Sequence, residues 1–287
     1  MVPQSSPVDG FRLTYERTGA GPPVVLLHGW PGDRADYREV TPLLSDRAEV
    51  IVPDLRGFGE SDKHLVDPSV AYSAAAQARS VLGLIDELGL ESPVIAGYDI
   101  GSRIAQTMAR TAPGRLRAIV VCPPLPGVGN RVLSASAQRE FWYQSFHRLE
   151  LAEALIDGNR AAVRAYLRHF WTHWSGPGYR QPEAALDRLT EIYSKPGAFT
   201  ASIGWYRSGS GTVASSLVET PPSPLGRISV DTRILWPEHD PLFPLAWGDR
   251  VTDFISHADL RTVPGVGHFV PLEASHDFAS AIRELFT

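Results

Sequence analysis

One stretch in the first half of the chain most constrains the fold: residues 93–103, Pro-Val-Ile-Ala-Gly-Tyr-Asp-Ile-Gly-Ser-Arg. It begins as a short apolar run with β-branched residues, which is typical of a buried strand, and it ends as the first turn of a helix. Glycines stand two residues before and two residues after Asp99. A sharp strand-to-helix turn needs such small neighbours, because the residue at its tip has a strained backbone and an exposed side chain. The stretch therefore predicts a strand–turn–helix unit with a carboxylate at its tip.

The same alternation of strand and helix continues on both sides of this unit. Short apolar runs predict strands, and apolar residues at helical spacing predict helices. The expected strands are 11–16, 24–27, 50–52, 94–97 and 116–121, and the expected helices are 72–88 and 100–110. Strands that alternate with helices in this way are typical of a parallel sheet covered by helices.

The pattern changes after Cys122. Residues 123–224 contain no apolar strand pattern, and their aromatic-rich segments predict helices at 140–155, 160–173, 183–193 and 198–207. After the proline-rich break at 221–224, strands are expected at 232–236 and 260–263, followed by a helix at 275–285. We therefore expect an α/β core made of residues 1–124 and 225–287. The intervening residues 125–224 are expected to form a helical cap, or lid, over one sheet edge.

Composition narrows the function classes. The 287-residue chain is 43% apolar and carries a formal charge of −5, without the basic face that nucleic acid binding requires. No apolar run approaches the roughly 20 residues that cross a bilayer, and residues 1–10 lack the features of a signal peptide. The single cysteine, Cys122, allows no intrachain disulfide and no cysteine metal cluster. We expect a cytoplasmic monomer or homodimer with no nucleic acid or membrane partner.

A carboxylate at a sharp turn can act as a nucleophile if a histidine activates water and an acid orients that histidine. Asp240 and His268 each follow a predicted strand, as Asp99 does. Because open α/β sheets place their sites at the carboxyl ends of strands, these three side chains could meet there. Alternatives remain open at this point. Asp99 could be a helix N-cap, and Glu238 and His239 are neighbouring rivals for the acid and the histidine.

Four further segments carry a family resemblance. Residues 28–31 (His-Gly-Trp-Pro) and 56–61 (Arg-Gly-Phe-Gly-Glu-Ser) are similar to the H-G-x-P oxyanion loop and the R-G-x-G-x-S segment of one family. Residues 141–144 (Phe-Trp-Tyr-Gln) and 204–207 (Gly-Trp-Tyr-Arg) are similar to its two lid segments, each of which carries a tyrosine. With the triad motifs, the chain resembles the α/β-hydrolase family over essentially its whole length. Within that family it resembles the epoxide hydrolases with an aspartate nucleophile.

The resemblance implies a fold, an activity and a set of residues. The fold would be an α/β-hydrolase fold, a mostly parallel doubly wound sheet with a helical cap inserted after the sixth core strand. The activity would be hydrolysis of an apolar or aromatic epoxide to a vicinal diol by way of an aspartyl ester and water, with no cofactor and no metal. The implied catalytic residues are Asp99, Asp240, His268, Tyr143 and Tyr206. The backbone N–H groups of Trp30 and Ile100 would form the oxyanion hole, and the implied substrate-binding residues are His28, Pro31, Trp142, Phe146, Trp205 and Phe269.

Two other functions remain open. Haloalkane and haloacid dehalogenases resemble this chain in the same triad. Haloalkane dehalogenases usually carry tryptophan directly after the nucleophile, and fluoroacetate-type enzymes carry arginine, where this chain has Ile100. The fluoroacetate type also has a His-Trp pair in the lid, where this chain has Tyr143 and Gln144. Some proteins of this fold are small-molecule receptors, a class against which an intact triad with two lid tyrosines argues.

Overall fold

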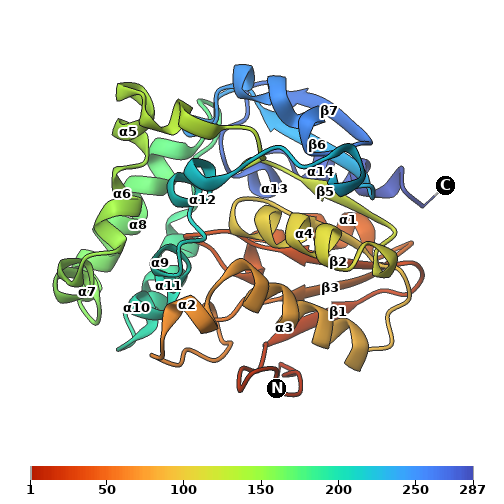
Figure 1. Ribbon diagram of the computed structural model, residues 1–287. Helices are drawn as coiled ribbons and strands as arrows, with labels where there is room; N and C mark the ends of the chain where they lie inside the picture. The colour runs from red at the N-terminus through yellow and green to blue at the C-terminus, as the bar shows by residue number, and fades with distance from the viewer. Residues whose placement is uncertain (1, 287) are drawn as a thin grey trace.

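A single seven-stranded sheet lies at the centre of the computed structural model, which describes residues 2–286 (Figure 1). The strand order is β1-β3-β2-β4-β5-β6-β7; β1 runs antiparallel to β3, and the remaining neighbours are parallel. The inner strands are buried along most of their length, as their continuous apolar runs predict. The strands are β1 (Tyr15–Thr18), β2 (Pro23–Leu27), β3 (Glu49–Pro53), β4 (Val94–Gly97), β5 (Ala118–Val121), β6 (Asp231–Pro237) and β7 (Ala258–Val263).

Helices of the core cover the sheet and connect its parallel strands. Helices α3 and α4 pack together, and α1 packs against α14, which gives the sheet a helical layer on each face (Figure 1). This arrangement confirms the expected α/β-hydrolase fold with a mostly parallel sheet. The core helices are α1 (Val40–Leu44), α2 (Pro68–Ala71), α3 (Ala74–Glu87), α4 (Ile100–Thr111), α13 (Val270–Glu273) and α14 (Ser275–Arg283).

The segment between β5 and β6 is helical, and its helices α5–α11 gather at one side of the sheet (Figure 1). We call residues 125–224 the cap. The segments 140–155 and 198–207 were each expected as one helix, but the first is broken at Phe141 and at residues 148–149 and the second at Ile203. Helices α5 and α12 were not expected. The cap helices are α5 (Ala135–Glu140), α6 (Trp142–His147), α7 (Glu150–Ile156), α8 (Arg160–Trp174), α9 (Glu183–Tyr193), α10 (Ala198–Ser202), α11 (Gly204–Arg207) and α12 (Thr212–Val218).

Two expectations about the strands need correction. The first strand spans Tyr15–Thr18 rather than residues 11–16, because residues 4–14 form only isolated bridges, Gln4 with Thr14 and Val8 with Phe11. The cap follows β5, the fifth strand of the described chain, and not a sixth core strand. In the part of the chain that the structure describes, no helix is long and apolar enough to cross a membrane.

Candidate active site

Asp99 occupies the tip of a sharp turn between β4 and α4. Its backbone has φ 49° and ψ −121°, a conformation that side-chain-bearing residues rarely adopt. The flanking glycines make the turn possible, since a Cβ at Gly101 would lie 1.9 Å from the Leu27 carbonyl oxygen. Asp99 stands at the N-cap position of α4, yet its side chain makes no capping hydrogen bond. The helix-cap alternative is therefore excluded, and the carboxylate is available for another task.

His268 lies between two carboxylates that come from separate parts of the chain. Its Nδ1 is 2.8 Å from Oδ2 of Asp240, and its Nε2 is 3.4 Å from Oδ2 of Asp99. Asp240 is fixed in turn, because its Oδ1 accepts a hydrogen bond of 2.8 Å from the backbone N–H of Leu242. The geometry thus brings together the nucleophile, histidine and acid expected from the sequence.

The rival residues lie elsewhere. The Glu238 side chain is 51% exposed and accepts a hydrogen bond from the backbone N–H of Gly265. The His239 side chain is 47% exposed and faces Glu238. Neither side chain reaches the buried group formed by Asp99, Asp240 and His268. Burial therefore distinguishes Asp240 and His268 from the two rivals that the sequence left open.

The two carboxylates determine the charge of His268. Complete burial lowers the pKa of the imidazole, but the charge and hydrogen bond of Asp240, and then the nearby charge of Asp99, outweigh it and raise the pKa to about 10. At neutral pH the resting triad therefore holds an imidazolium between two carboxylates. Loss of the Asp99 charge would remove part of what keeps His268 protonated.

A backbone N–H group is aimed at the Asp99 carboxylate. The N–H of Trp30 donates a hydrogen bond of 2.8 Å to Oδ1 of Asp99. Ile100, whose N–H was expected to be the second donor, begins α4 beside the same cavity. The loop carrying Trp30 is held by His28, whose Nε2 accepts a hydrogen bond of 3.0 Å from the N–H of Leu55.

Both expected cap tyrosines reach the cavity beside Asp99. Tyr143 comes from α6 and Tyr206 from α11; their rings lie 5.5 Å apart and nearly perpendicular. Trp30 stacks on Tyr143 with ring centroids 5.8 Å apart, which fixes one side of that ring. Burial first, with the Asp99 charge contributing, raises the pKa of both phenols well above the ordinary value. Both tyrosines are therefore protonated at neutral pH.

The cavity between the core and the cap is small. Its volume is about 10 Å³, which is room for about one water molecule. A substrate larger than water would therefore require some of the residues that line the cavity to move. The lining residues are Asp99, Ile100, Arg103, Pro124, Tyr143, Gln144, Trp205, Tyr206, Ser210 and Thr212.

Most of the expected substrate-binding residues are not among these lining residues. Trp205 lines the cavity, whereas His28 and Pro31 belong to the loop that presents Trp30. Trp142 is 42% exposed. The other expected residues pack within aromatic clusters, Phe146 against Trp142 and Phe269 against Trp171 at 3.8 Å. The sequence could not separate cap core from cavity wall, because both are aromatic.

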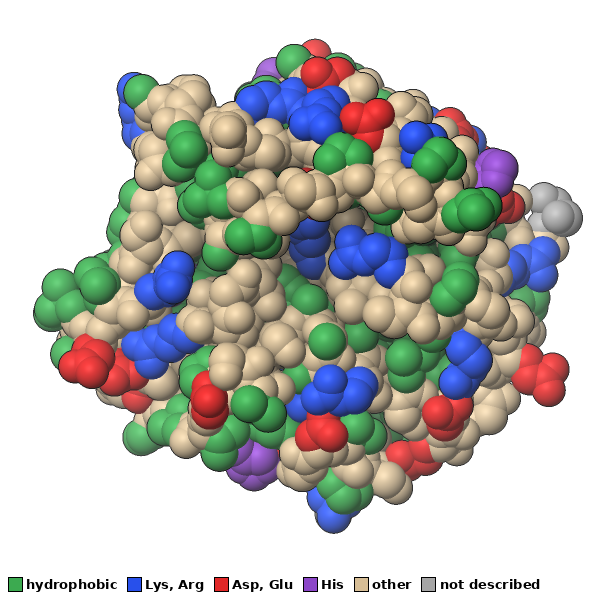
Figure 2. All heavy atoms as spheres, viewed as in Figure 1, with side chains coloured by type: hydrophobic (Ala, Val, Ile, Leu, Met, Phe, Trp, Pro, Cys, Tyr) green, Lys and Arg blue, Asp and Glu red, His purple; other side chains and the backbone are tan. Residues whose placement is uncertain are grey.

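Four polar lining residues were missed, Arg103, Gln144, Ser210 and Thr212. Gln144 directly follows Tyr143, and Arg103 lies one helical turn after Asp99, so it shares the Asp99 side of α4. Helical spacing from Asp99 was a signal that could have indicated Arg103. The Arg103 guanidinium lies 3.8 Å from the Glu219 carboxylate, which itself lines a separate outer groove of about 200 Å³. Figure 2 shows Lys and Arg side chains in a hollow on the face where α4 and α12 lie.

The cap is attached to the Trp30 loop by a charged contact. Arg188 of α9 donates to both carboxylate oxygens of Asp33, at 2.5 and 2.8 Å. The hydroxyl of Tyr193, one helical turn further along α9, donates to the carbonyl oxygen of Gly32 at 2.9 Å. On the core side, Tyr98 donates to Oδ2 of Asp36 at 2.6 Å. The loop is thus held between α9 and the strand end that carries Asp99.

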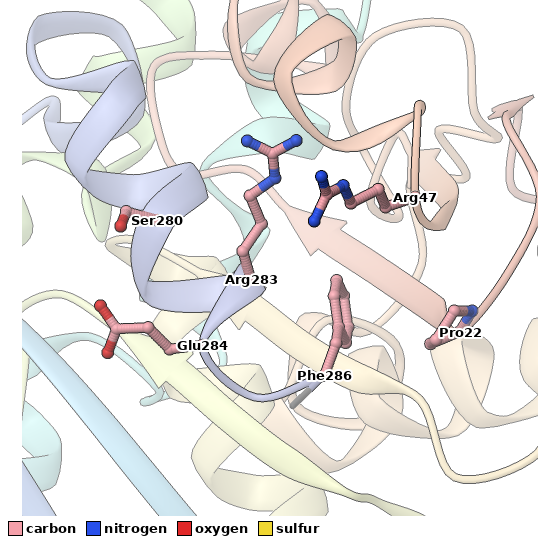
Figure 3. Close-up of a pocket in the computed structure, with 6 residues that line it drawn as sticks. All are labelled: Pro22, Arg47, Ser280, Arg283, Glu284 and Phe286. Carbon is pink, nitrogen blue, oxygen red and sulfur yellow. The ribbon is translucent and has the colours of Figure 1, made fainter.

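A larger groove lies away from the triad. It has a volume of about 560 Å³ and is open to solvent near the end of α14, where Figure 3 shows the Arg47 and Arg283 guanidinium groups near each other. Both arginines lie close to the surface carboxylate of Asp46. This groove contains no triad residue, so size alone does not locate the chemistry.

Comparison with known proteins agrees with this fold. Residues 22–275 match the model of the family described as alpha/beta hydrolase fold. A soluble epoxide hydrolase of Corynebacterium sp. (strain C12) is 29% identical over 210 residues, covering 70% of each chain. A haloalkane dehalogenase of Bradyrhizobium diazoefficiens is 31% identical over 176 residues, covering 60% of this chain and 50% of that protein. The solved structure of the epoxide hydrolase CorEH is similar in fold, with a TM-score of 0.83 at 24% identity, covering 100% of this chain and 98% of that one. The chain is therefore a member of the α/β-hydrolase fold family.

Proposed function

We propose that this protein hydrolyses epoxides to vicinal diols through a covalent ester on Asp99. The observation that carries the proposal is a single cavity that is lined by the Asp99 carboxylate, at the tip of the turn between β4 and α4, and by the two protonated phenols of Tyr143 and Tyr206. A carboxylate is already anionic, so it needs no base to attack carbon. The phenols supply what an opening epoxide requires, a proton donor at the departing oxygen. The apolar and aromatic side chains among the lining residues, Ile100, Pro124 and Trp205, support an apolar or aromatic epoxide as the substrate.

In the first step, Asp99 attacks one epoxide carbon while Tyr143 and Tyr206 donate hydrogen bonds to the ring oxygen. A carbon–oxygen bond forms to Asp99, the ring carbon–oxygen bond breaks, and the alkoxide takes a proton from a phenol. The Asp99 charge is consumed by the ester, which lowers the proton affinity of His268. The imidazolium can then return a proton to the phenol, and neutral His268 becomes a base.

In the second step, His268 takes a proton from water, and the hydroxide attacks the ester carbonyl carbon. The N–H of Trp30, which already donates to Oδ1 of Asp99, would stabilise the resulting oxyanion. The intermediate collapses with cleavage of the ester carbon–oxygen bond, and the departing alkoxide takes the proton of the newly formed Asp99 carboxylic acid. The diol then leaves, Asp99 is again a carboxylate and His268 is again protonated. The sum is one epoxide and one water converted to one diol.

The test separates the two steps with two variants. His268→Gln should form the ester but not release it, so intact-mass spectrometry should show the protein plus one substrate mass. Tyr143→Phe with Tyr206→Phe should slow ester formation by about 10²–10⁴-fold, the usual contribution of a positioned acid. His239→Gln, which changes an exposed histidine, is the matched control and should retain turnover. An unmodified His268→Gln protein, or normal turnover by the double tyrosine variant, would contradict the mechanism.

Dehalogenation is the second candidate, and the identity to a haloalkane dehalogenase favours considering it. Ile100 offers the cavity an apolar side chain instead of a halide donor. Halide release from a panel of haloalkanes and haloacids would support this candidate over the first. If the protein turns over neither an epoxide such as styrene oxide nor any compound of the haloalkane and haloacid panel, the remaining hypothesis is a small-molecule receptor.

A further inference from the structure

Gln144 is a buried polar residue of the cavity that the mechanism above does not use. It is 6% exposed and follows Tyr143 on α6. Its Nε2 donates a hydrogen bond of 3.2 Å to the hydroxyl oxygen of Tyr143. Its Oε1 accepts a hydrogen bond of 3.0 Å from the backbone N–H of Val213, in the first turn of α12.

The second contact fixes the direction of the first. A backbone N–H can only donate, so the atom of the Gln144 amide that faces Val213 must be the oxygen. The amide nitrogen must then face Tyr143, and it can only donate. The phenol oxygen of Tyr143 is therefore an acceptor in this contact. Its own proton has to point elsewhere, and the open direction is the cavity that it shares with Asp99.

The contact also acts on charge. Burial, and next the charge of Asp99, raise the pKa of Tyr143, whereas the hydrogen bond from Gln144 lowers it. When Tyr143 gives its proton to the epoxide oxygen, negative charge develops on the phenol oxygen. A donor that is already in place becomes stronger as that charge grows.

The side-chain amide of Gln144 fits because the neighbouring residue 211 is a glycine. A Cβ placed on Gly211 would lie 2.8 Å from Oε1 of Gln144 and 3.1 Å from the Tyr206 ring. The φ of Gly211 is −61°, a value that any residue adopts. Glycine is therefore needed here because a side chain would not fit, and not because of the backbone conformation. Gly211 is thus a second, independent place at which the position of the amide can be disturbed.

We propose that Gln144 is a positioning residue that directs the Tyr143 proton into the cavity and stabilises the phenol oxygen as it gives up that proton. The proposal rests on the proposed epoxide opening and adds a residue to its first step. Gln144 should therefore affect ester formation through Tyr143 and leave ester hydrolysis unchanged.

The experiment measures the rate of adduct formation with styrene oxide in the His268→Gln parent. Gln144→Leu should slow this rate about 10- to 100-fold, as expected for a lost hydrogen bond to a charged group. Gln144→Glu keeps the size but replaces the donor with an acceptor, and it should be at least as slow. In a Tyr143→Phe background, Gln144→Leu should change the rate less than about 2-fold, because the oxygen on which it acts is gone. With His268 intact, the breakdown rate of the ester should match that of wild type.

Controls separate this proposal from the general mechanism and from folding. Gln138→Leu removes the same amide from an exposed position on α5 and should leave the rate unchanged. Gly211→Ala should slow ester formation without altering Gln144, so the test holds even if a Gln144 variant does not fold. The proposal would be overturned, while the epoxide mechanism stands, by any of three results. These are an unchanged rate of ester formation in both Gln144→Leu and Gly211→Ala, recovery of the rate in Gln144→Glu, and independent effects of the Gln144 and Tyr143 substitutions. No adduct in the parent would overturn both.

Discussion

Asp99 combines a reactive position with a strained backbone. Its φ of 49° lies in the region that favours glycine, and such strain costs about 1–3 kcal/mol. A residue that only capped a helix would not need this conformation. The turn projects the carboxylate toward Trp30 and His268, so the strain serves the position of the side chain.

The strain predicts an inverted order of stability at this residue. Asp99→Gly and Asp99→Ala both remove the carboxylate and should both abolish ester formation. At most positions alanine is more stable than glycine by about 0.5–1 kcal/mol. At Asp99 the glycine variant should instead have the higher free energy of unfolding, by about 1–2 kcal/mol. Urea denaturation of the two variants measures the difference, and an alanine variant equal to or more stable than the glycine variant would contradict it.

At the scale of elements, α9 holds the cap against the loop that carries Trp30. The Asp33 carboxylate is buried beneath the loop, and Arg188 binds both of its oxygens. Burial raises the pKa of Asp33, but the hydrogen bonds and the charge of Arg188 outweigh burial and lower it. The Arg188 side chain is itself 40% exposed. The contact is thus intermediate between a surface pair and a buried pair, and its main effect is to neutralise a carboxylate that cannot reach water.

Removing Arg188 alone should lower the free energy of unfolding more than removing both Arg188 and the buried Asp33 carboxylate. Arg188→Met should lower the free energy of unfolding by about 1–3 kcal/mol, less than for a fully buried pair because Arg188 is partly exposed. Adding Asp33→Asn should recover much of that loss, since no buried charge remains. Arg168→Met, which breaks an exposed pair with Glu183 on the neighbouring helix, is the control and should cost less than about 1 kcal/mol. Chemical denaturation measures all four proteins; equal losses in Arg188→Met and Arg168→Met would argue against the contact.

At the scale of the whole molecule, the triad joins three distant parts of the chain. Asp99 follows β4, Asp240 follows β6 and His268 follows β7, so global unfolding separates all three. The raised pKa of His268, about 10 in the folded protein, makes this arrangement sensitive to pH. The unfolded imidazole has a pKa near ~6.5.

The sign of the pH effect follows from these two values. Folding favours protonated His268, so its stabilisation is complete below about pH 6.5 and is lost as the pH rises toward about 10. The difference in unfolding free energy between wild type and His268→Gln should therefore shrink between pH 6 and pH 9.5. Urea denaturation at the two pH values measures it, with His239→Gln as the exposed-histidine control. A difference that stays constant or grows with pH would show that His268 is not protonated in the folded triad.

Local sequence rules determined much of this protein. Apolar runs located the inner strands β2, β3, β4 and β5, because a parallel strand buried on both faces must be apolar along its length. The strands expected at 232–236 and 260–263, which are not continuous apolar runs, lie within β6 and β7. The glycines around Asp99 predicted the turn, and the positions of Asp240 and His268 after strands predicted that they would meet it. The sequence failed where periodicity is weak, as in the first strand, in α12 and in the breaks within residues 140–155.

Only the tertiary structure separated the candidate residues from their sequence neighbours. Burial distinguished Asp240 and His268 from Glu238 and His239, which differ little in sequence context. The absence of a side-chain cap at Asp99 depends on its backbone conformation and on the hydrogen bond from Trp30 of a distant loop. The contacts of Gln144 with Tyr143 and Val213 depend on how separate segments of the cap pack against one another. The physical reason is that strands and turns follow from local patterns, whereas a cavity is defined by side chains from segments far apart in the chain.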